Sequence, residues 1–332
     1  MQSALLFFAV GLCVSLFASY RRSARLNARL PGPDLQLEKA AKAARRGRWE
    51  PVAELLAATG RDWDLRSHRV IKIGQLADRK GYAWLESWER ARPGDPDAAA
   101  VRSAVQIRIA WQLRGSQGAV NTSRKQFDDF HSALEAAREA IATADRLNPD
   151  DPTPLVQEIW VALGLGYSHS AMEDLWKRIT ERSPHHFLAH SAALQYWCGK
   201  WRGSEELARE FAESAAAQAP PGSLLASLPL FEWYEHQDEQ ATDAHFRSAL
   251  LTEAIDAARA DVQAARPDHP GAASVHHILA YLLVRQGRHR EAMEHFRAVD
   301  GYVDGLPWRY LPTSQQKAMF EEYRTKAAKK SR

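Results

Sequence analysis

The chain has 332 residues, of which 45% are hydrophobic and 26% are charged, and its net charge is +3. This small positive excess does not favour a nucleic-acid-binding protein, whose basic residues usually form a strong patch. The two cysteines, Cys13 and Cys198, cannot form a disulfide framework, which indicates a reducing compartment. Ala, Arg, Leu and Glu dominate the composition, and this favours an all-α protein.

The first predicted element is an uncharged apolar helix from Ala4 to Tyr20. At 1.5 Å per residue it would be about 25 Å long, which is close to the thickness of a bilayer core. No Lys or Arg precedes it, whereas a secretory signal usually begins with positive charge. We therefore expect residues 1–20 to be a single-pass membrane anchor. A cleaved signal and a buried helix are the alternatives.

A basic stretch follows the apolar segment directly. Residues 21–48 contain nine Lys or Arg and only two acids. Since basic residues stay on the cytoplasmic side, the bulk of the chain should be cytoplasmic. Residues 21–33 are predicted to be a basic juxtamembrane linker. The residues expected at the anionic membrane surface are Arg21, Arg22, Arg25 and Arg29.

From residue 34 onward the sequence alternates between helical patterns and short breaks, and it predicts at least twelve helices and no sheet. Asp34 is placed to cap the first of these helices. Two S/T-x-x-E/Q patterns, Ser170 with Glu173 and Thr313 with Gln316, predict capping boxes. The breaks, rich in Pro, Gly, Asp and Ser, are 59–64, 92–97, 148–154, 182–186, 219–223 and 266–271.

A recurring spacing links several of these helices. Gly287, His289, Ala292 and Phe296 keep intervals of two, three and four residues. The first three positions recur as Gly47, Trp49 and Val52, and as Gly199, Trp201 and Ser204. A Gly can end one helix, a small residue lets two helices approach, and a large residue fills the groove between them.

This spacing resembles the tetratricopeptide repeat, a pair of helices that stacks with its neighbours. The resemblance covers residues 34–300 and implies a superhelical solenoid of antiparallel helix pairs. Ala292 and Phe296 would then be interior contacts. The layout also resembles a family of membrane-anchored actinobacterial proteins with a domain of unknown function. Motifs such as "AWLESWERARPGDPDA" and "IAWQLRGS" carry that second resemblance.

The last region, residues 301–332, is predicted to be an aromatic loop followed by an amphipathic helix from Thr313 to Lys329 and a basic tail. Met319, Phe320 and Tyr323 share one face of that helix. Such a helix would cover the exposed end of the last helix pair.

The repeat resemblance also implies where a ligand would bind. In tetratricopeptide repeats, positions two, five, nine and twelve of the first helix line a concave surface. In the units that begin at His185 and at Ala273, the resemblance implies His186, Tyr196, His277 and Tyr281 as partner-binding residues. The chain is accordingly predicted to be a membrane-tethered scaffold or adaptor that binds a protein or peptide, with no cofactor and no nucleic-acid partner.

The alternative is a metal-dependent enzyme with a histidine site in the groove. His186 and His190 are spaced i, i+4 on one predicted helix, and His277 would be a third ligand. A zinc site needs three or four ligands near 2.0 Å from the metal. The intervening residues lack the Glu of the HExxH motif, so we expect structural histidines and assign no metal ligand and no catalytic residue.

Overall fold

The structure is a computed structural model, and it describes residues 26–76, 82–115, 123–237 and 241–331. The described residues are helical and contain no strand; their only bridge pairs Asn27 with Tyr302. The all-α prediction is confirmed. The prediction of at least twelve helices is also confirmed, because α2 to α16 all begin and end between residues 34 and 300.

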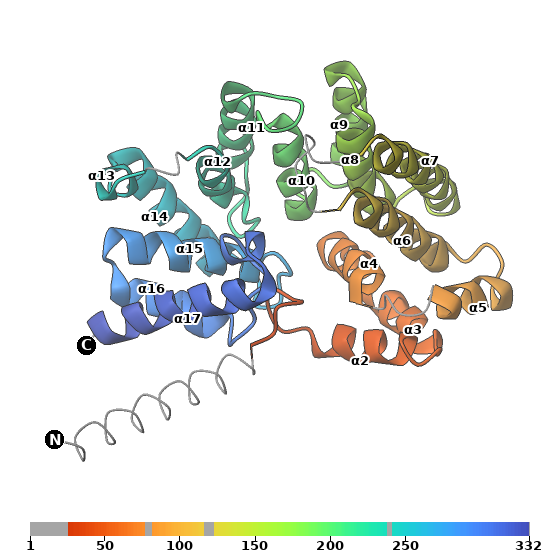
Figure 1. The fold of residues 1–332 in the computed structure, drawn as a ribbon, viewed down its shortest axis with the longest axis horizontal. Helices are drawn as coiled ribbons and strands as arrows, with labels where there is room; N and C mark the ends of the chain where they lie inside the picture. The colour runs from red at the N-terminus through yellow and green to blue at the C-terminus, as the bar shows by residue number, and fades with distance from the viewer. Residues whose placement is uncertain (1–25, 77–81, 116–122, 238–240, 332) are drawn as a thin grey trace, which may run out of the picture. The chain divides into compact units, whose positions relative to one another are not determined.

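The described helices follow one another with short connections (Figure 1). They are α2 (Leu35–Ala44), α3 (Glu50–Thr59), α4 (Trp63–Leu76), α5 (Ala83–Ala91), α6 (Pro96–Arg114), α7 (Arg124–Leu147), α8 (Thr153–Leu165), α9 (His169–Arg182), α10 (Phe187–Trp197), α11 (Glu205–Ala217), η3 (Leu225–Ser227), α12 (Leu228–His236), α13 (Asp243–Phe246), α14 (Ala249–Ala264), α15 (Ala272–Gln286), α16 (His289–Ala298), η4 (Trp308–Tyr310) and α17 (Thr313–Lys330).

Contacts divide the chain into two compact units. Among the described residues, those between 34 and 237 and residues 260–271 form the large unit, and residues 26–33, 241–259 and 272–331 form the small unit. The sequence predicts one solenoid over 34–300, and this stays a prediction. In the structure, the last helix pair and residues 26–33 belong to the same unit, and the division falls within α14.

The predicted breaks coincide with the ends of helices. Asp34 caps α2, because its carboxylate accepts a hydrogen bond from the Leu37 N–H at 2.9 Å. Both predicted capping boxes were wrong. Ser168, two residues earlier than expected, caps α9. At α17 the Gln316 side chain is buried and donates to the Val303 carbonyl at 2.6 Å, so a loop contact replaces the expected cap.

Two glycines of the recurring spacing follow the first helix of a pair in the left-handed region. Gly47 has φ +85° after α2, and Gly287 has φ +83° after α15. A residue with a side chain is strained there, so glycine lets the chain reverse direction at low cost. Gly199 does not share this conformation. The same spacing therefore marks two different turns.

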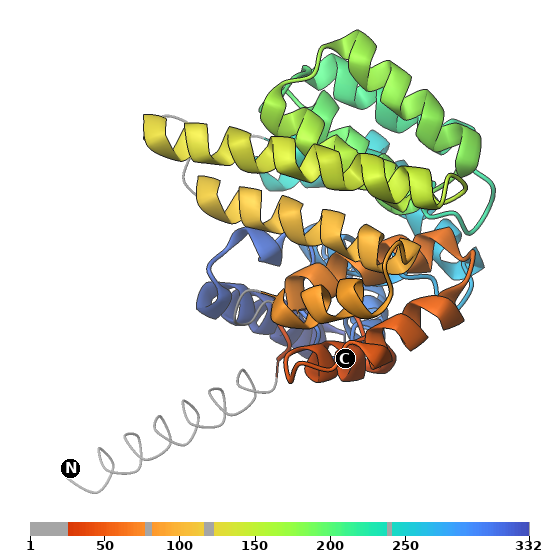
Figure 2. The same ribbon diagram turned by 90° about the vertical axis from the view of Figure 1, so that its right-hand side faces the viewer.

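Within the large unit, alternate helices contact each other. The helix α4 packs against α6, α6 against α8, and α8 against α10, while α4 also reaches α8 and α10. The long helices α6 and α7 lie side by side (Figure 2). The helices α7 and α8 also pack closely, because Gly164 of α8 faces α7. A Cβ at Gly164 would come within 2.3 Å of the Leu134 side chain.

An aromatic core holds the small unit together. Ala292 and Phe296 of α16 are buried, as the recurring spacing predicts. Phe296 packs edge-on against Phe320 of α17, and Trp308 packs against both rings. The C-terminal helix thus packs against α16 and α15 with an aromatic face.

Among the helices in the described part of the chain, none is both long enough and apolar enough to cross a membrane. The predicted anchor, residues 1–20, lies outside the described residues, as do Arg21, Arg22 and Arg25. Arg29 is described and exposed. Residues 26–33, predicted to be part of a linker, instead belong to the small unit and hydrogen-bond to residues 301–304.

Candidate functional site

The large unit contains a groove of about 340 Å³ where α4, α6 and α8 meet. Its floor is formed by Ala104, Ile107 and the buried Gln157. The remaining lining residues are Ile71, Gln75, Arg108, Trp111, Gln112 and Trp160. A concave, largely apolar surface with a few amide groups is the usual form of a small binding site.

A close helix crossing sets the depth of the groove. Gly74 of α4 faces Ala104 of α6, and a Cβ at Gly74 would lie 3.0 Å from the Ala104 Cβ. Two small residues therefore let the helix backbones approach, while the larger Ile71 and Ile107 lie one turn away on either helix. The groove follows from this alternation of small and large residues.

Aromatic packing fixes the wall of the groove. The Trp111 ring contacts Trp160 and Trp201 edge-on, at centroid distances of 6.2 and 5.7 Å, and Phe130 at 5.1 Å. Arg114 lies over the Trp111 ring, 5.5 Å from its centroid. Such contacts hold large rings in one orientation. The wall is therefore preorganised, which lowers the entropic cost of binding.

Polar groups support the floor. The Gln157 side-chain amide donates to Ser103 Oγ at 3.0 Å, and so the α6 and α8 helices are tied together beneath the groove. The indole N–H of Trp111 is buried, and it has no hydrogen-bond acceptor among the described residues. An unsatisfied buried donor costs about 1–3 kcal/mol, and natural structures often explain it by a ligand or water.

A buried polar network joins the N-terminal ends of α4, α6, α8 and α10. Arg66 Nε donates to Asp151 at 2.6 Å, and Arg66 Nη2 donates to Asp97 at 2.6 Å. Burial opposes the charge on Arg66, but the two carboxylates outweigh it and raise the pKa of the guanidinium. The Ser67 hydroxyl lies 2.8 Å from Thr153 Oγ1 and 2.9 Å from His186 Nε2.

Ser67, His186 and Asp64 lie close together, and they are the residue types of a hydrolase catalytic triad. The His186 Nδ1 lies 3.4 Å from Asp64 Oδ1. However, His186 is the N-cap of α10, and its Nδ1 accepts a hydrogen bond from the Ala189 N–H at 3.2 Å. A ring nitrogen that accepts carries no proton, so His186 is the Nε2–H tautomer and cannot donate to Asp64.

The position of the proton on His186 indicates that the network is structural and not catalytic. In a triad the histidine Nδ1–H donates to the acid and Nε2 accepts the serine proton, which is the reverse of the arrangement here. Ser67 and His186 are both fully buried. The network therefore links four helices and does not prepare a nucleophile.

The four predicted partner-binding residues are all buried. Tyr196 donates its hydroxyl to the Tyr167 carbonyl at 2.7 Å, and Tyr281 packs against Phe246 and Trp308. His277 accepts from the Trp308 indole at 3.1 Å and lies 2.8 Å from the Pro31 carbonyl. Together with His186, they form internal contacts, and none of the four lines the groove.

The alternative metal site receives no support from the arrangement of the histidines. The His190 Nδ1–H donates to the His186 carbonyl at 2.9 Å, and its ring packs edge-on against Trp176. Burial lowers the pKa of His190 to about 4. Within the residues that the structure describes, no three His, Cys, Asp or Glu side chains are grouped to hold a metal ion.

Comparison of the chain with protein family models, curated proteins and solved structures gave no match. The groove is lined by residues that the repeat resemblance did not single out. The motif "IAWQLRGS", which carried the second resemblance, contains two of the lining residues, Trp111 and Gln112.

Proposed function

We propose that the chain is a membrane-tethered, tetratricopeptide-like helical scaffold that binds a segment of another protein in the groove between α4, α6 and α8. The groove itself is the observation that supports this proposal most strongly. It lies between alternate helices, which is where a solenoid of helix pairs has its concave surface. Its volume is sufficient for one or two large apolar side chains.

The lining indicates the chemistry of the partner. Ile71, Ile107 and the two Trp rings would surround an aliphatic or aromatic anchor. Gln75 and Gln112 at the rim are exposed amides that suit the backbone of a bound peptide. Apolar anchors on a helix or extended segment are a common mode of peptide recognition.

A peptide selection tests this site. We expect the full chain in detergent micelles to enrich, from a phage-displayed random library, peptides with an aliphatic or aromatic anchor. Ile71→Arg, which fills the groove with a charged side chain, should weaken binding of a selected peptide at least tenfold. Glu139→Arg, an exposed change on α7 outside the groove, is the matched control. Equal binding by both variants would mean that the groove is not the site.

The proposed topology is an anchor in the membrane with the helical units in the cytoplasm. Cys198 is a poor reporter, because its thiol is buried and burial raises its pKa to about 12. Lys177 is suitable, since its side chain is 76% exposed. In a Cys13→Ser, Lys177→Cys protein, an impermeant thiol reagent should label only after lysis. Labelling in intact spheroplasts would place the helical units outside.

A further inference from the structure

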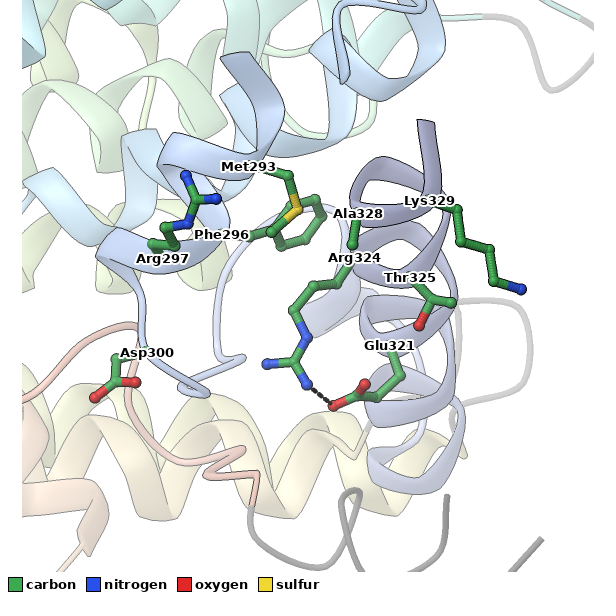
Figure 3. A pocket seen from close by; sticks show the side chains of 9 residues that line it. All are labelled: Met293, Phe296, Arg297, Asp300, Glu321, Arg324, Thr325, Ala328 and Lys329. Atoms are coloured by element: carbon green, nitrogen blue, oxygen red, sulfur yellow. Dashed lines mark hydrogen bonds and ion pairs between the residues drawn. The ribbon is translucent and has the colours of Figure 1, made fainter. Parts of the chain in front are cut away.

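A second groove, of about 710 Å³, lies in the small unit between α16 and α17 (Figure 3). Met293 and Phe296 of α16 face Ala328 of α17 across it and form an apolar floor. The remaining lining residues, Arg297, Asp300, Glu321, Arg324, Thr325 and Lys329, are polar or charged. This groove has no role in the peptide site proposed above.

The rim carries both signs of charge. Arg324 donates to Glu321 at 2.5 Å, and this pair points into the space between the helices (Figure 3). Arg297 and Asp300 are both exposed at the α16 side. A purely anionic ligand would meet two carboxylates, and a purely cationic ligand would meet three basic residues. The rim therefore suits a group that carries both a negative and a positive charge.

The segment that leads to the predicted anchor starts beside this groove. The Asn27 N–H donates to the Gly301 carbonyl at 3.0 Å, and the Val303 N–H donates to the Asn27 carbonyl at 2.8 Å. Gly301 directly follows Asp300 of the groove rim. Only residues 21–25 separate Leu26 from the end of the predicted anchor, and they can span roughly 20 Å at most.

From this placement we infer that the α16/α17 groove binds the headgroup of an aminophospholipid of the membrane. The inference depends on the membrane tether in the proposed function. The lipid phosphate would meet Arg297 and Arg324, and the primary ammonium would donate to Asp300 and Glu321. The glycerol and the first methylenes would lie on Met293 and Phe296. A choline headgroup has no N–H donor, so it fits the carboxylates less well.

Native mass spectrometry of the full chain in an uncharged detergent tests this inference. Phosphatidylethanolamine should bind at least tenfold more tightly than phosphatidylcholine or phosphatidylglycerol. Asp300→Asn removes the charge and keeps a residue that tolerates the φ of +41° found there. It should abolish the preference for phosphatidylethanolamine over phosphatidylcholine. Arg290→Gln changes an exposed charge on α16 outside the groove and should leave the preference unchanged.

Soluble glycerophosphoethanolamine distinguishes binding of the headgroup alone from binding of the intact lipid. It should bind far more weakly than phosphatidylethanolamine because it lacks the acyl methylenes. Equal binding of the three lipids, or an unchanged preference in Asp300→Asn, would overturn the inference. Peptide binding to Ile71→Arg and labelling of Lys177→Cys are measured separately. A failed lipid preference with those two results intact would remove the headgroup site and leave the scaffold proposal standing.

Discussion

Replacing Arg66 with Met should lower the free energy of unfolding by about 3–5 kcal/mol, because Asp151 would remain buried without its cation. Asp151 is only 1% exposed, and Arg66 is its charged partner at 2.6 Å. The Thr153 N–H still donates to Asp151 at 2.8 Å, but one backbone donor does not replace a guanidinium. Urea unfolding followed by circular dichroism measures the loss.

A matched control separates burial from charge. Arg61 and Asp150 form an ion pair at 3.0 Å whose side chains are 74% and 62% exposed. Arg61→Met should change the stability by no more than about 0.5 kcal/mol. The double variant Arg66→Met, Asp151→Asn should recover part of the loss, because the uncompensated charge is gone. A loss below about 1 kcal/mol for Arg66→Met alone would mean that the network does not join the helices as described.

Acid should unfold the small unit between pH 6.5 and about 4. Burial lowers the pKa of His276 and of His277 to about 4, and that of His295 to about 3. In the unfolded chain a histidine has a pKa near 6.5. Between these values the unfolded state binds more protons than the folded state, so stability falls as the pH falls.

The geometry explains why these histidines stay neutral. The Nδ1 atoms of His276 and His295 lie 2.8 Å apart, so one donates and the other accepts, and the accepting ring must be neutral. Arg259 further lowers the pKa of His295, although Glu291 acts in the opposite direction. Each histidine contributes roughly 1.4 kcal/mol per pH unit in this range, and three contribute roughly 4. Lowering the pH by two units would therefore remove much of the free energy of unfolding of a typical domain, which is about 5–15 kcal/mol.

A single tryptophan reports on this transition. Trp308 is the one Trp that belongs to the small unit, and it donates to His277. In 5-fluorotryptophan-labelled protein, the ¹⁹F signal missing from Trp308→Phe is that of Trp308. This signal should move to its unfolded position as the pH falls from 6.5 to 4.5, and His276→Gln with His295→Gln should reduce the pH dependence. A signal unchanged down to pH 4 would contradict the prediction.

The helices could be predicted from sequence because their limits depend on local chemistry. The Asp34 side chain accepts from one free N–H group of a first turn, and Gly287 adopts a conformation that other residues avoid. Both signals act within a few residues, so they can be recognised without knowledge of the fold. The burial of Phe296 followed from the same local spacing.

The burial of the four residues predicted to bind a partner could not be read from the sequence, because exposure depends on contacts that are distant in sequence. In the tetratricopeptide repeats that the chain resembles, the position of His186 lines the concave surface. Here it is covered by Ser67 and the Trp63 carbonyl of α4, which lie more than one hundred residues earlier. The groove itself depends on the crossing of Gly74 and Ala104. Nothing in the local pattern of either helix specifies that crossing.

Binding of a protein segment to the groove between α4, α6 and α8 is the central proposal, and it can be tested in cells that express the full chain. A photo-crosslinking phenylalanine analogue is placed at Gln75 on the groove rim, and in a second protein at the exposed Glu139 of α7. Irradiation should join the Gln75 protein to one reproducible partner, and Ile71→Arg should abolish the product. Crosslinks that are the same from both positions, or that persist with Ile71→Arg, would contradict the account.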